Sequence, residues 1–315
     1  MIEEDEQTVA LDDSYREIVR FANRDFQRYA LENGVYFAPV DDDEIDRLQY
    51  MHAIFNMMFD NRLIFPPIPN PQRILDCGYG SAAWAIDVAR QYPECEVLGI
   101  DIYPYPIPED CPPNVDFQVD DLNSPSTFPS NYFDLVHSRM MAGGIHANQW
   151  PNYMRDIYRI LRPGGWCQMV EIYFNAQSDN GTLTAGMRLK GPWVILEFSI
   201  VANVTRDHAL RRWSQLYLNS MQPAKDPRAA MHLQNWMIEA GFEQVEARML
   251  TLPLSGWPTD PRQHDIGAAN RPNVHRLLLS LALYPFSRVL GLSNTDIQLL
   301  VAQARNEADN PAFKV

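Results

Sequence analysis

The chain has 315 residues, of which 46% are apolar, and its formal net charge of −14 gives a pI near 4.9. A chain of this size can bury a sizeable core, as one large domain or as a core with a cap. The acidic balance argues against a groove that tracks phosphates, so we expect no nucleic acid among its partners.

The acidic amino end, Glu3-Glu-Asp-Glu6, lacks the basic and apolar regions of a secretory signal. The longest apolar stretch, Leu277 to Tyr284, is too short to span a bilayer. The four cysteines form no C-x-x-C pair, and the histidines have no metal-ligand spacing. We therefore expect a cytoplasmic protein with no membrane partner, no disulfide framework and no metal.

The first 69 residues are predicted to form a helical N-terminal cap that is rich in aromatic residues and methionine. Helices are expected at Ser14–Asn23 and from Glu44 to Phe59, with an interruption at Gly34 and a stop at Pro66-Pro67.

Residues 70–175 alternate strand and helix patterns, which predicts an α/β fold with a parallel sheet and right-handed crossovers. The five expected strands are Arg73–Asp76, Val97–Asp101, Val115–Asp121, Tyr132–Arg139 and Cys167–Glu171.

The first strand runs through Asp76 into a glycine turn, with Gly78 and Gly80 at its centre. Glycine permits the sharp turn and a close approach of backbone to ligand, and the following helix start favours an anionic group. Asp101 ends the second strand, 23 residues beyond Gly78, where it can accept hydrogen bonds from a ribose diol.

The glycines alone leave three interpretations open. Gly78 to Ala83 fits the G-x-G-x-x-A fingerprint of a dinucleotide site, and the run from Asp76 fits the D-x-G-x-G loop for S-adenosylmethionine (SAM). The third interpretation is an ordinary tight turn in a doubly wound domain.

Later residues favour SAM. Asp76 repels a pyrophosphate but suits the ammonium of an amino-acid-like ligand. Asp120 and Asp121 end the third strand, and Ser138-Arg139 ends the fourth. Because the carboxyl ends of parallel strands share one edge, these residues describe a ligand crevice there.

The run from Asn70 to Glu171 resembles class I SAM-dependent methyltransferases, specifically the fungal LaeA-like group, which includes a regulator of secondary metabolism and many tailoring methyltransferases. The similar segments are Asp43–Leu48, Asn70–Asp76, Trp84–Asp87, Pro112–Val115, Val119–Asp121, Val136–Arg139, Met141–Gly143, Leu161–Trp166 and Ser178–Leu183. The resemblance implies a Rossmann-like sheet, SAM as cofactor and S-adenosylhomocysteine as product.

The resemblance also implies roles for single residues. It places Gly78 and Gly80 beside the methionine portion of SAM, Asp101 on the ribose, and Asp121 near the adenine. The remaining candidates for cofactor binding are Asp76, Tyr79, Ile102, Asp120 and Ser138.

The glycine loop departs from the usual family pattern D-L-G-T-G-T-G-I-W. Tyr79 replaces a small polar residue, so it either stacks over or enters the cofactor pocket, or points outward. Ala82 replaces the third glycine, which adds strain of about 1 kcal/mol if that position needs a positive φ.

Two histidines are candidate general bases, because the loops after the fourth strand border the crevice. His146 is the first choice, with an exposed loop residue as the alternative; His137 is the second, with a packing role as its alternative. Arg139, Glu171 and Trp193 are candidate substrate residues; Arg139 suits a carboxylate or a structural salt bridge, and Glu171 an amine or a hydroxyl.

Residues 176–227 are predicted to be a helical substrate lid inserted after the fifth strand, and 228–315 the remainder of the core. This last part is expected to contain a helix Arg228–Ala240 capped by Gly241, a strand Gln244–Leu250, and a helix from Asn294 to Asn306. The usual seventh strand is very short or absent, and another segment or chain is then expected to cover the open edge.

The expected function is SAM-dependent methylation of O or N on a hydrophobic small molecule of fungal secondary metabolism, because aromatic and methionine side chains flank the crevice. One alternative is a LaeA-like regulator that acts through protein partners, which would permit a nuclear location. Another is a non-methylating reaction, such as a cyclisation, on the same fold. The candidate macromolecular partners are a second copy of the chain, as a homodimer, or another protein.

Overall fold

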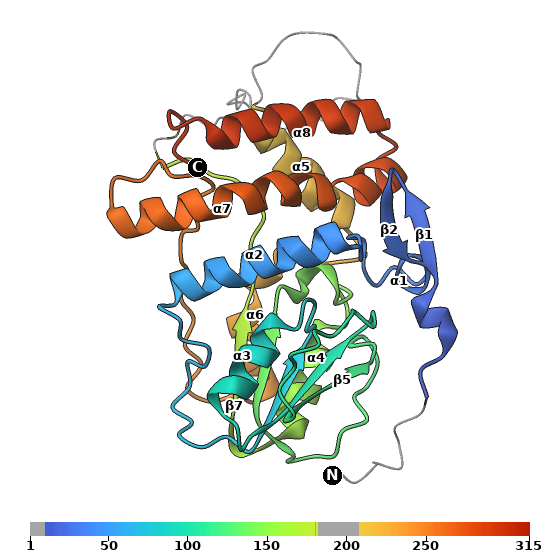
Figure 1. Cartoon of the computed structure of the whole chain (residues 1–315), viewed down its shortest axis with the longest axis vertical. Helices are drawn as coiled ribbons and strands as arrows, with labels where there is room; N and C mark the ends of the chain where they lie inside the picture. The colour runs from blue at the N-terminus through green and yellow to red at the C-terminus, as the bar shows by residue number, and fades with distance from the viewer. Residues whose placement is uncertain (1–9, 180, 182–207) are drawn as a thin grey trace, which may run out of the picture.

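A parallel five-stranded sheet forms the lower half of the molecule in the computed structural model, which describes residues 10–179, 181 and 208–315 (Figure 1). Its strand order is β5-β4-β3-β6-β7. The strands are β3 (Arg73–Cys77), β4 (Glu96–Asp101), β5 (Val115–Val119), β6 (Phe133–Arg139) and β7 (Leu161–Val170). The chain order reverses between β3 and β6, which is the position where open α/β sheets bind ligands.

Helices cover both faces of this sheet, as the near-continuous apolar strands require. Helix α3 (Ala83–Gln91) packs on one face through Trp84 and Val88. Helices α4 (Trp150–Ile160) and α6 (Leu233–Ala240) belong to the other face, where Trp150 stacks on Trp236 with ring centroids 5.0 Å apart. The predicted α/β class is confirmed and all five expected strands are present, although β7 begins at Leu161 rather than at the expected Cys167.

A cap of long helices lies above the sheet (Figure 1). It contains α2 (Asp42–Met58), α5 (Ala209–Met221), α7 (Pro261–Ser280) and α8 (Asn294–Asp309). Helices α5, α7 and α8 share a core that includes Trp213, which stacks on Tyr217 at 5.3 Å. The smaller elements are α1 (Arg28–Glu32), a π-turn at Pro285–Val289, and 3₁₀ turns at Asp13–Arg16, Met141–Gly143 and Ala229–Met231. Within the described ranges, no helix has the length and hydropathy needed to cross a membrane.

The predicted helix Ser14–Asn23 is wrong, because this segment begins a β-hairpin. Strand β1 (Ile18–Phe21) pairs with β2 (Arg24–Gln27) in antiparallel register. Ala22 and Asn23 both have positive φ, +50° and +62°, which is typical of the two-residue turns that join hairpins. The β-branched and aromatic residues of β1 favour the extended state, and the Asn at the turn is the local signal for it.

The predicted strand Gln244–Leu250 is also wrong. This segment has no regular structure and is largely exposed, with Met249 at 80%. Its alternation of apolar and polar residues suits a strand, but it is not paired with β7, which is the last strand of the described sheet. The helix before it is present as α6, with Gly241 at φ +105° as its cap.

Buried charges join the hairpin, α2 and α7. Arg24 donates to both oxygens of Asp41 at 2.6 Å, and Asp41 caps α2. Arg47 donates to Glu44 Oε1 at 2.7 and 2.9 Å, and to Asn273 Oδ1 on α7 at 3.4 Å. These two arginines therefore neutralise Asp41 and Glu44.

Candidate functional site

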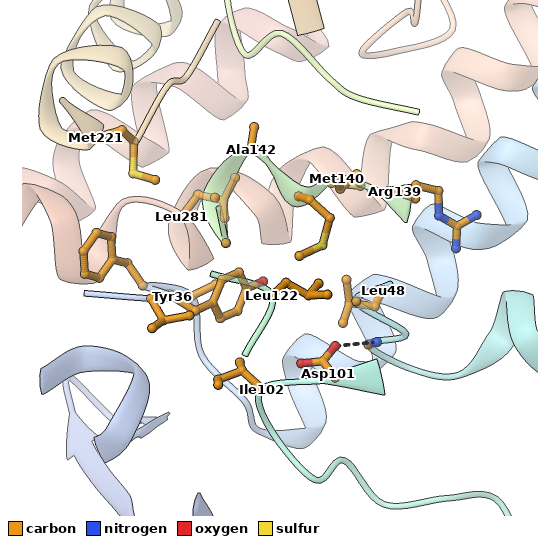
Figure 2. Close-up of a pocket in the computed structure, with 18 of the residues that line it drawn as sticks. Tyr36, Leu48, Asp101, Ile102, Leu122, Arg139, Met140, Ala142, Met221 and Leu281 are labelled. Carbon is orange, nitrogen blue, oxygen red and sulfur yellow. Dashed lines mark hydrogen bonds between the residues drawn. The ribbon is translucent and has the colours of Figure 1, made fainter. Parts of the chain in front are cut away.

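A pocket lies at the carboxyl ends of β3, β4, β5 and β6, beneath the cap (Figure 2). Its cavity volume is about 120 Å³. The sheet contributes the glycine loop and carboxylates, and the cap contributes mostly apolar side chains.

The glycine loop needs both of its glycines. Gly78 has φ +76°, and a Cβ there would lie 2.3 Å from Met141 Sδ. Gly80 has φ +52°, and its N–H donates to Asp101 Oδ2 at 2.9 Å. The Met141 thioether thus lies against the bare Cα of Gly78, in the space that a missing side chain leaves.

Tyr79 neither stacks over the pocket nor points to solvent. Its side chain is 6% exposed and packs behind the loop against Tyr105 and Phe117, with ring centroids 6.3 and 4.7 Å away. Its hydroxyl is 3.4 Å from the carbonyl oxygen of Tyr103. Tyr79 does not line the pocket, so this departure from the family pattern leaves the ligand space open.

Ala82 has φ +61° and occupies the N-cap position of α3. This is the left-handed region, where a Cβ costs about 1 kcal/mol. The replaced third glycine therefore introduces backbone strain at the start of the helix.

Four of the candidate cofactor residues line the pocket at the ends of β4 and β5: Asp101, Ile102, Asp120 and Asp121. The Asp101 carboxylate accepts hydrogen bonds from Gly80 and Tyr103. Burial raises its pKa to about 6, although those backbone N–H groups oppose the rise. Burial also raises the pKa of Asp120.

Asp76, His137 and Ser138 lie below the pocket and do not line it. Asp76 is 3% exposed; burial raises its pKa to about 7, and Arg139 opposes this rise. His137 packs edge-on against Trp84 at 3.8 Å, and burial lowers its pKa well below the usual range. Ser138 Oγ accepts a hydrogen bond from Tyr153 at 3.0 Å. His137 thus has the packing environment that sequence analysis gave as its alternative.

His146 lies beside the pocket rather than in its wall. Its backbone N–H donates to Asn123 Oδ1 at 2.7 Å, and its Nε2 is buried with no hydrogen-bond partner among the described residues. Burial lowers its pKa, and the nearby Lys225 adds to this effect. The Lys225 ammonium is itself buried and donates to the Gly144 carbonyl at 2.8 Å.

Glu171 and Arg139 both line the pocket. Glu171 Oε1 accepts from the Met141 N–H at 2.6 Å and Oε2 from the Ala142 N–H at 3.2 Å, so the carboxylate holds the loop after β6. Burial raises its pKa to about 8. Arg139 contacts His52 and Phe55 of α2. Trp193, the third candidate substrate residue, lies outside the described residues.

The cap wall contains residues that sequence analysis did not single out. Figure 2 shows Tyr36, Leu48, Met221 and Leu281 around the same space as Asp101. They come from segments spread between residues 36 and 281, and no local pattern identifies which aromatic or aliphatic side chains face a pocket. The only local signal is their general apolar character.

The site fits the nucleoside ligand expected from the sequence. The space beside the Gly78 Cα can hold a ligand atom once the flexible Met141 side chain moves. Asp101 retains unused acceptor lone pairs toward the pocket, because each oxygen of its carboxylate accepts one backbone hydrogen bond. Among the residues that the structure describes, no cluster of His, Cys, Asp and Glu could hold a metal ion.

Comparison with known proteins gives a family match. A methyltransferase-domain family model matches residues 50–247. The secondary metabolism regulator laeA of Aspergillus fumigatus is 32% identical over 286 residues, which cover 90% of this chain and 70% of that protein.

Two further relatives show the same extent of similarity. The secondary metabolism regulator LAE1 of Cochliobolus heterostrophus is 31% identical over 90% of this chain and 87% of its own length. The protein-methionine methyltransferase laeA of Emericella nidulans is 31% identical over 90% of this chain and 70% of its own length.

Solved structures resemble the chain more weakly. A Haemonchus contortus phosphoethanolamine N-methyltransferase in complex with S-adenosyl-L-methionine has a TM-score of 0.45 and 18% identity, covering 84% of this chain and 49% of that one. The [4+2]-cyclase SpnF has a TM-score of 0.41 and 16% identity, covering 78% and 71%. Similarities of this strength carry no conclusion about the reaction.

Proposed function

The chain belongs to the LaeA-like group of class I methyltransferases, whose cofactor is S-adenosyl-L-methionine, and from this premise we propose that it methylates N or O of a hydrophobic small molecule in fungal secondary metabolism. The observation that carries this proposal is the apolar wall of the pocket, which stands opposite the glycine loop and Asp101. An apolar acceptor would gain from burial against this wall.

The glycine loop and the strand-end acids would hold the cofactor. Gly78 and Gly80 would lie beside its methionine portion, Asp101 would accept hydrogen bonds from the ribose, and Asp120 and Asp121 would border the adenine. Bound there, SAM supplies an electrophilic methyl group on a sulfonium. The protein's part is then to bring the acceptor into line and to exclude water.

The cap would hold the acceptor. Tyr36 and Leu48 come from the segment before the sheet, whereas Tyr217, Met221 and Leu281 come from the segments after it. Their side chains cover the pocket opposite the sheet, so an acceptor between the two walls loses its contact with water.

The charge state of the pocket favours an acceptor that needs no base. Burial raises the pKa of Glu171 to about 8, so this carboxyl group is mostly protonated at neutral pH. His146 and His137 do not line the pocket. A neutral amine or an oxygen that is already ionised reacts with a sulfonium without losing a proton first.

Cofactor binding can be tested with a matched pair of glycine variants. Gly78→Ala puts a Cβ 2.3 Å from Met141 Sδ at φ +76°, and we expect it to lower the affinity for S-adenosylhomocysteine by about 100-fold or more in titration calorimetry. Gly164→Ala has a similar φ of +79° but nothing within 4 Å, so affinity should be unchanged. Equal effects of the two changes would contradict the proposed binding of the cofactor beside Gly78.

The acceptor class can be tested with methyl-labelled SAM. The protein is incubated with a solvent extract of fungal small metabolites or with fungal protein, and the label is counted in each fraction. Label in an extracted metabolite supports the proposal, provided that Gly78→Ala abolishes it. Label confined to protein contradicts the small-molecule acceptor. Cofactor binding without transfer to either fraction contradicts methylation and favours a non-methylating reaction.

A second candidate function is regulation through a protein partner. It is favoured by the relatives named secondary metabolism regulators, which match 90% of this chain. The relative named protein-methionine methyltransferase adds a compatible chemistry, because a thioether acceptor needs no base. Label transferred to a methionine of fungal protein would support this second function.

A further inference from the structure

Two arginines line the pocket, and their charges are balanced differently. Arg47 is 1% exposed and lies 2.7 Å from Glu44 Oε1, so its charge is neutralised. Arg139 has no carboxylate within 4.0 Å among residues 10–179, 181 and 208–315. Arg139 is therefore the pocket arginine whose charge remains available to a ligand.

Arg139 is held by α2 rather than by an acid. Both of its Nη atoms lie 3.4 Å from His52 Nδ1, and its Cζ lies 5.1 Å from the centre of the Phe55 ring. Figure 2 shows this side chain at one edge of the pocket. The imidazole and the ring fix one side of the guanidinium and leave its other N–H groups for a ligand.

The imidazole is in turn held by α3. His52 Nε2 lies 2.9 Å from Asp87 Oδ2, and His52 is 7% exposed. A carboxylate at this distance selects the tautomer that carries hydrogen on Nε2, which leaves the lone pair of Nδ1 to accept from Arg139. Hydrogen bonding to His52 lowers the pKa of Asp87, which keeps this carboxylate ionised. Asp87, His52 and Arg139 thus form one chain of contacts through α3, α2 and β6.

The sheet places Arg139 beside the glycine loop. Cys77 of β3 pairs with Ser138 of β6, so Arg139 and Gly78 follow on adjacent strands at the point where the strand order reverses. Asp101, at the end of the strand on the other side of β3, would repel a carboxylate. Arg139 is the group near Gly78 that attracts one.

We propose that Arg139 binds the carboxylate of the cofactor's amino-acid portion, and that His52, held by Asp87, is a positioning residue that directs the guanidinium. The inference rests on the proposed placement of that portion beside Gly78. It assigns Arg139 to the cofactor instead of the substrate, and it gives roles to two residues that line no part of the pocket.

Titration calorimetry with two ligands tests this assignment. The ligands are S-adenosylhomocysteine and its decarboxylated form, which keeps the amine and the thioether. A hydrogen bond to a charged group contributes about 1.5–3 kcal/mol, so Arg139→Met should lower the affinity for S-adenosylhomocysteine by about 10- to 100-fold. The same variant should leave the affinity for the decarboxylated form within about twofold.

Variants of His52 separate positioning from simple support of the fold. His52→Phe keeps a ring but removes both nitrogens, and should reproduce the ligand-specific loss of Arg139→Met at about tenfold. His52→Asn places an amide oxygen near the position of Nδ1 and should recover part of the affinity. Arg90→Gln is the matched control, because Arg90 Nη1 lies 3.7 Å from Asp87 Oδ1 without touching His52; it should change neither affinity.

Equal losses for both ligands in Arg139→Met or His52→Phe would mean a merely structural role and would overturn the proposal. Unchanged affinity for S-adenosylhomocysteine would overturn it as well. In either case the wild-type protein still binds both ligands and the proposed function stands. If the wild type binds neither ligand, the proposed function fails and this inference fails with it.

Discussion

The sheet below the pocket and the cap above it balance their charges in opposite ways. On the sheet side, burial raises the pKa of Asp76, Asp101 and Glu171 to about 7, 6 and 8, because none has an ion-pair partner among the described residues. On the cap side, Asp41 and Glu44 are paired with arginines. Paired charges hold elements together, whereas unpaired charges at a pocket are available to a ligand.

The largest effect is expected from breaking a cap pair. Arg47→Met would leave Glu44, which is 0% exposed, with only the more distant Arg24, whose Nη2 lies 4.0 Å from Oε2. Loss of one partner of a buried pair costs about 3–5 kcal/mol. The free energy of unfolding in denaturant measures this. The double variant Glu44→Gln with Arg47→Met should regain part of the lost stability. If Arg47→Met alone is as stable as wild type, the Glu44–Arg47 pair has no structural role.

A pH series should distinguish the sheet from the cap by the sign of the change in stability. The raised pKa of Asp76 means that the folded protein binds more protons than the unfolded chain between about pH 4 and 7, so this group's contribution to stability falls as the pH rises through that range. Asp76→Asn removes this ionisation. The free energy of unfolding of the variant, relative to that of wild type, should therefore increase from pH 4 to 7. Thermal or denaturant unfolding at each pH measures the difference.

Asp41→Asn is the control from the cap. Burial opposes ionisation of Asp41, but hydrogen bonds from Arg24 and from the Asp25 N–H lower its pKa on balance. The ionised Asp41 carboxylate therefore contributes to folding stability at neutral pH, and this contribution is lost as the pH falls through the lowered pKa. The Asn variant should be most destabilised, relative to wild type, at neutral pH. Parallel curves for the two variants would contradict the contrast between the sheet and the cap.

The smallest effect is expected at the start of α3. Ala82→Gly relieves about 1 kcal/mol of strain at φ +61°, and the extra entropy of an unfolded glycine offsets about half of it. Unfolding should therefore show a gain of about 0.5 kcal/mol. Ala85→Gly, within the same helix and 0% exposed, should instead lose about 1 kcal/mol. If both variants lose stability, the left-handed strain is not significant.

The sheet side of the site was predictable because its signals are local. Asp76, Gly78 and Asp101 follow directly from strand ends and a turn, so their places are set within a few residues. The cap wall was not, because Tyr36 and Leu281 meet only when distant helices pack. His52 and Asp87 were missed for the same reason, although the helices that carry them were identified in part.

Two errors in the fold have a similar cause. Residues 18–21 and 244–250 carry patterns compatible with more than one state, and the choice depends on the presence of a pairing partner. The first segment has its partner in Arg24–Gln27, whereas the second is exposed and unpaired.

The residues that line the pocket come from both the first and the last parts of the chain, so the pocket is completed only late in protein synthesis. Once residues 70–175 have left the ribosome, the glycine loop and Asp101 are present, but Leu281 and Pro285 of the opposite wall are not. A ligand that needs both walls can stabilise only the finished fold, because stabilisation by mass action requires a formed site. Ligand binding thereby reports that the last helices have docked.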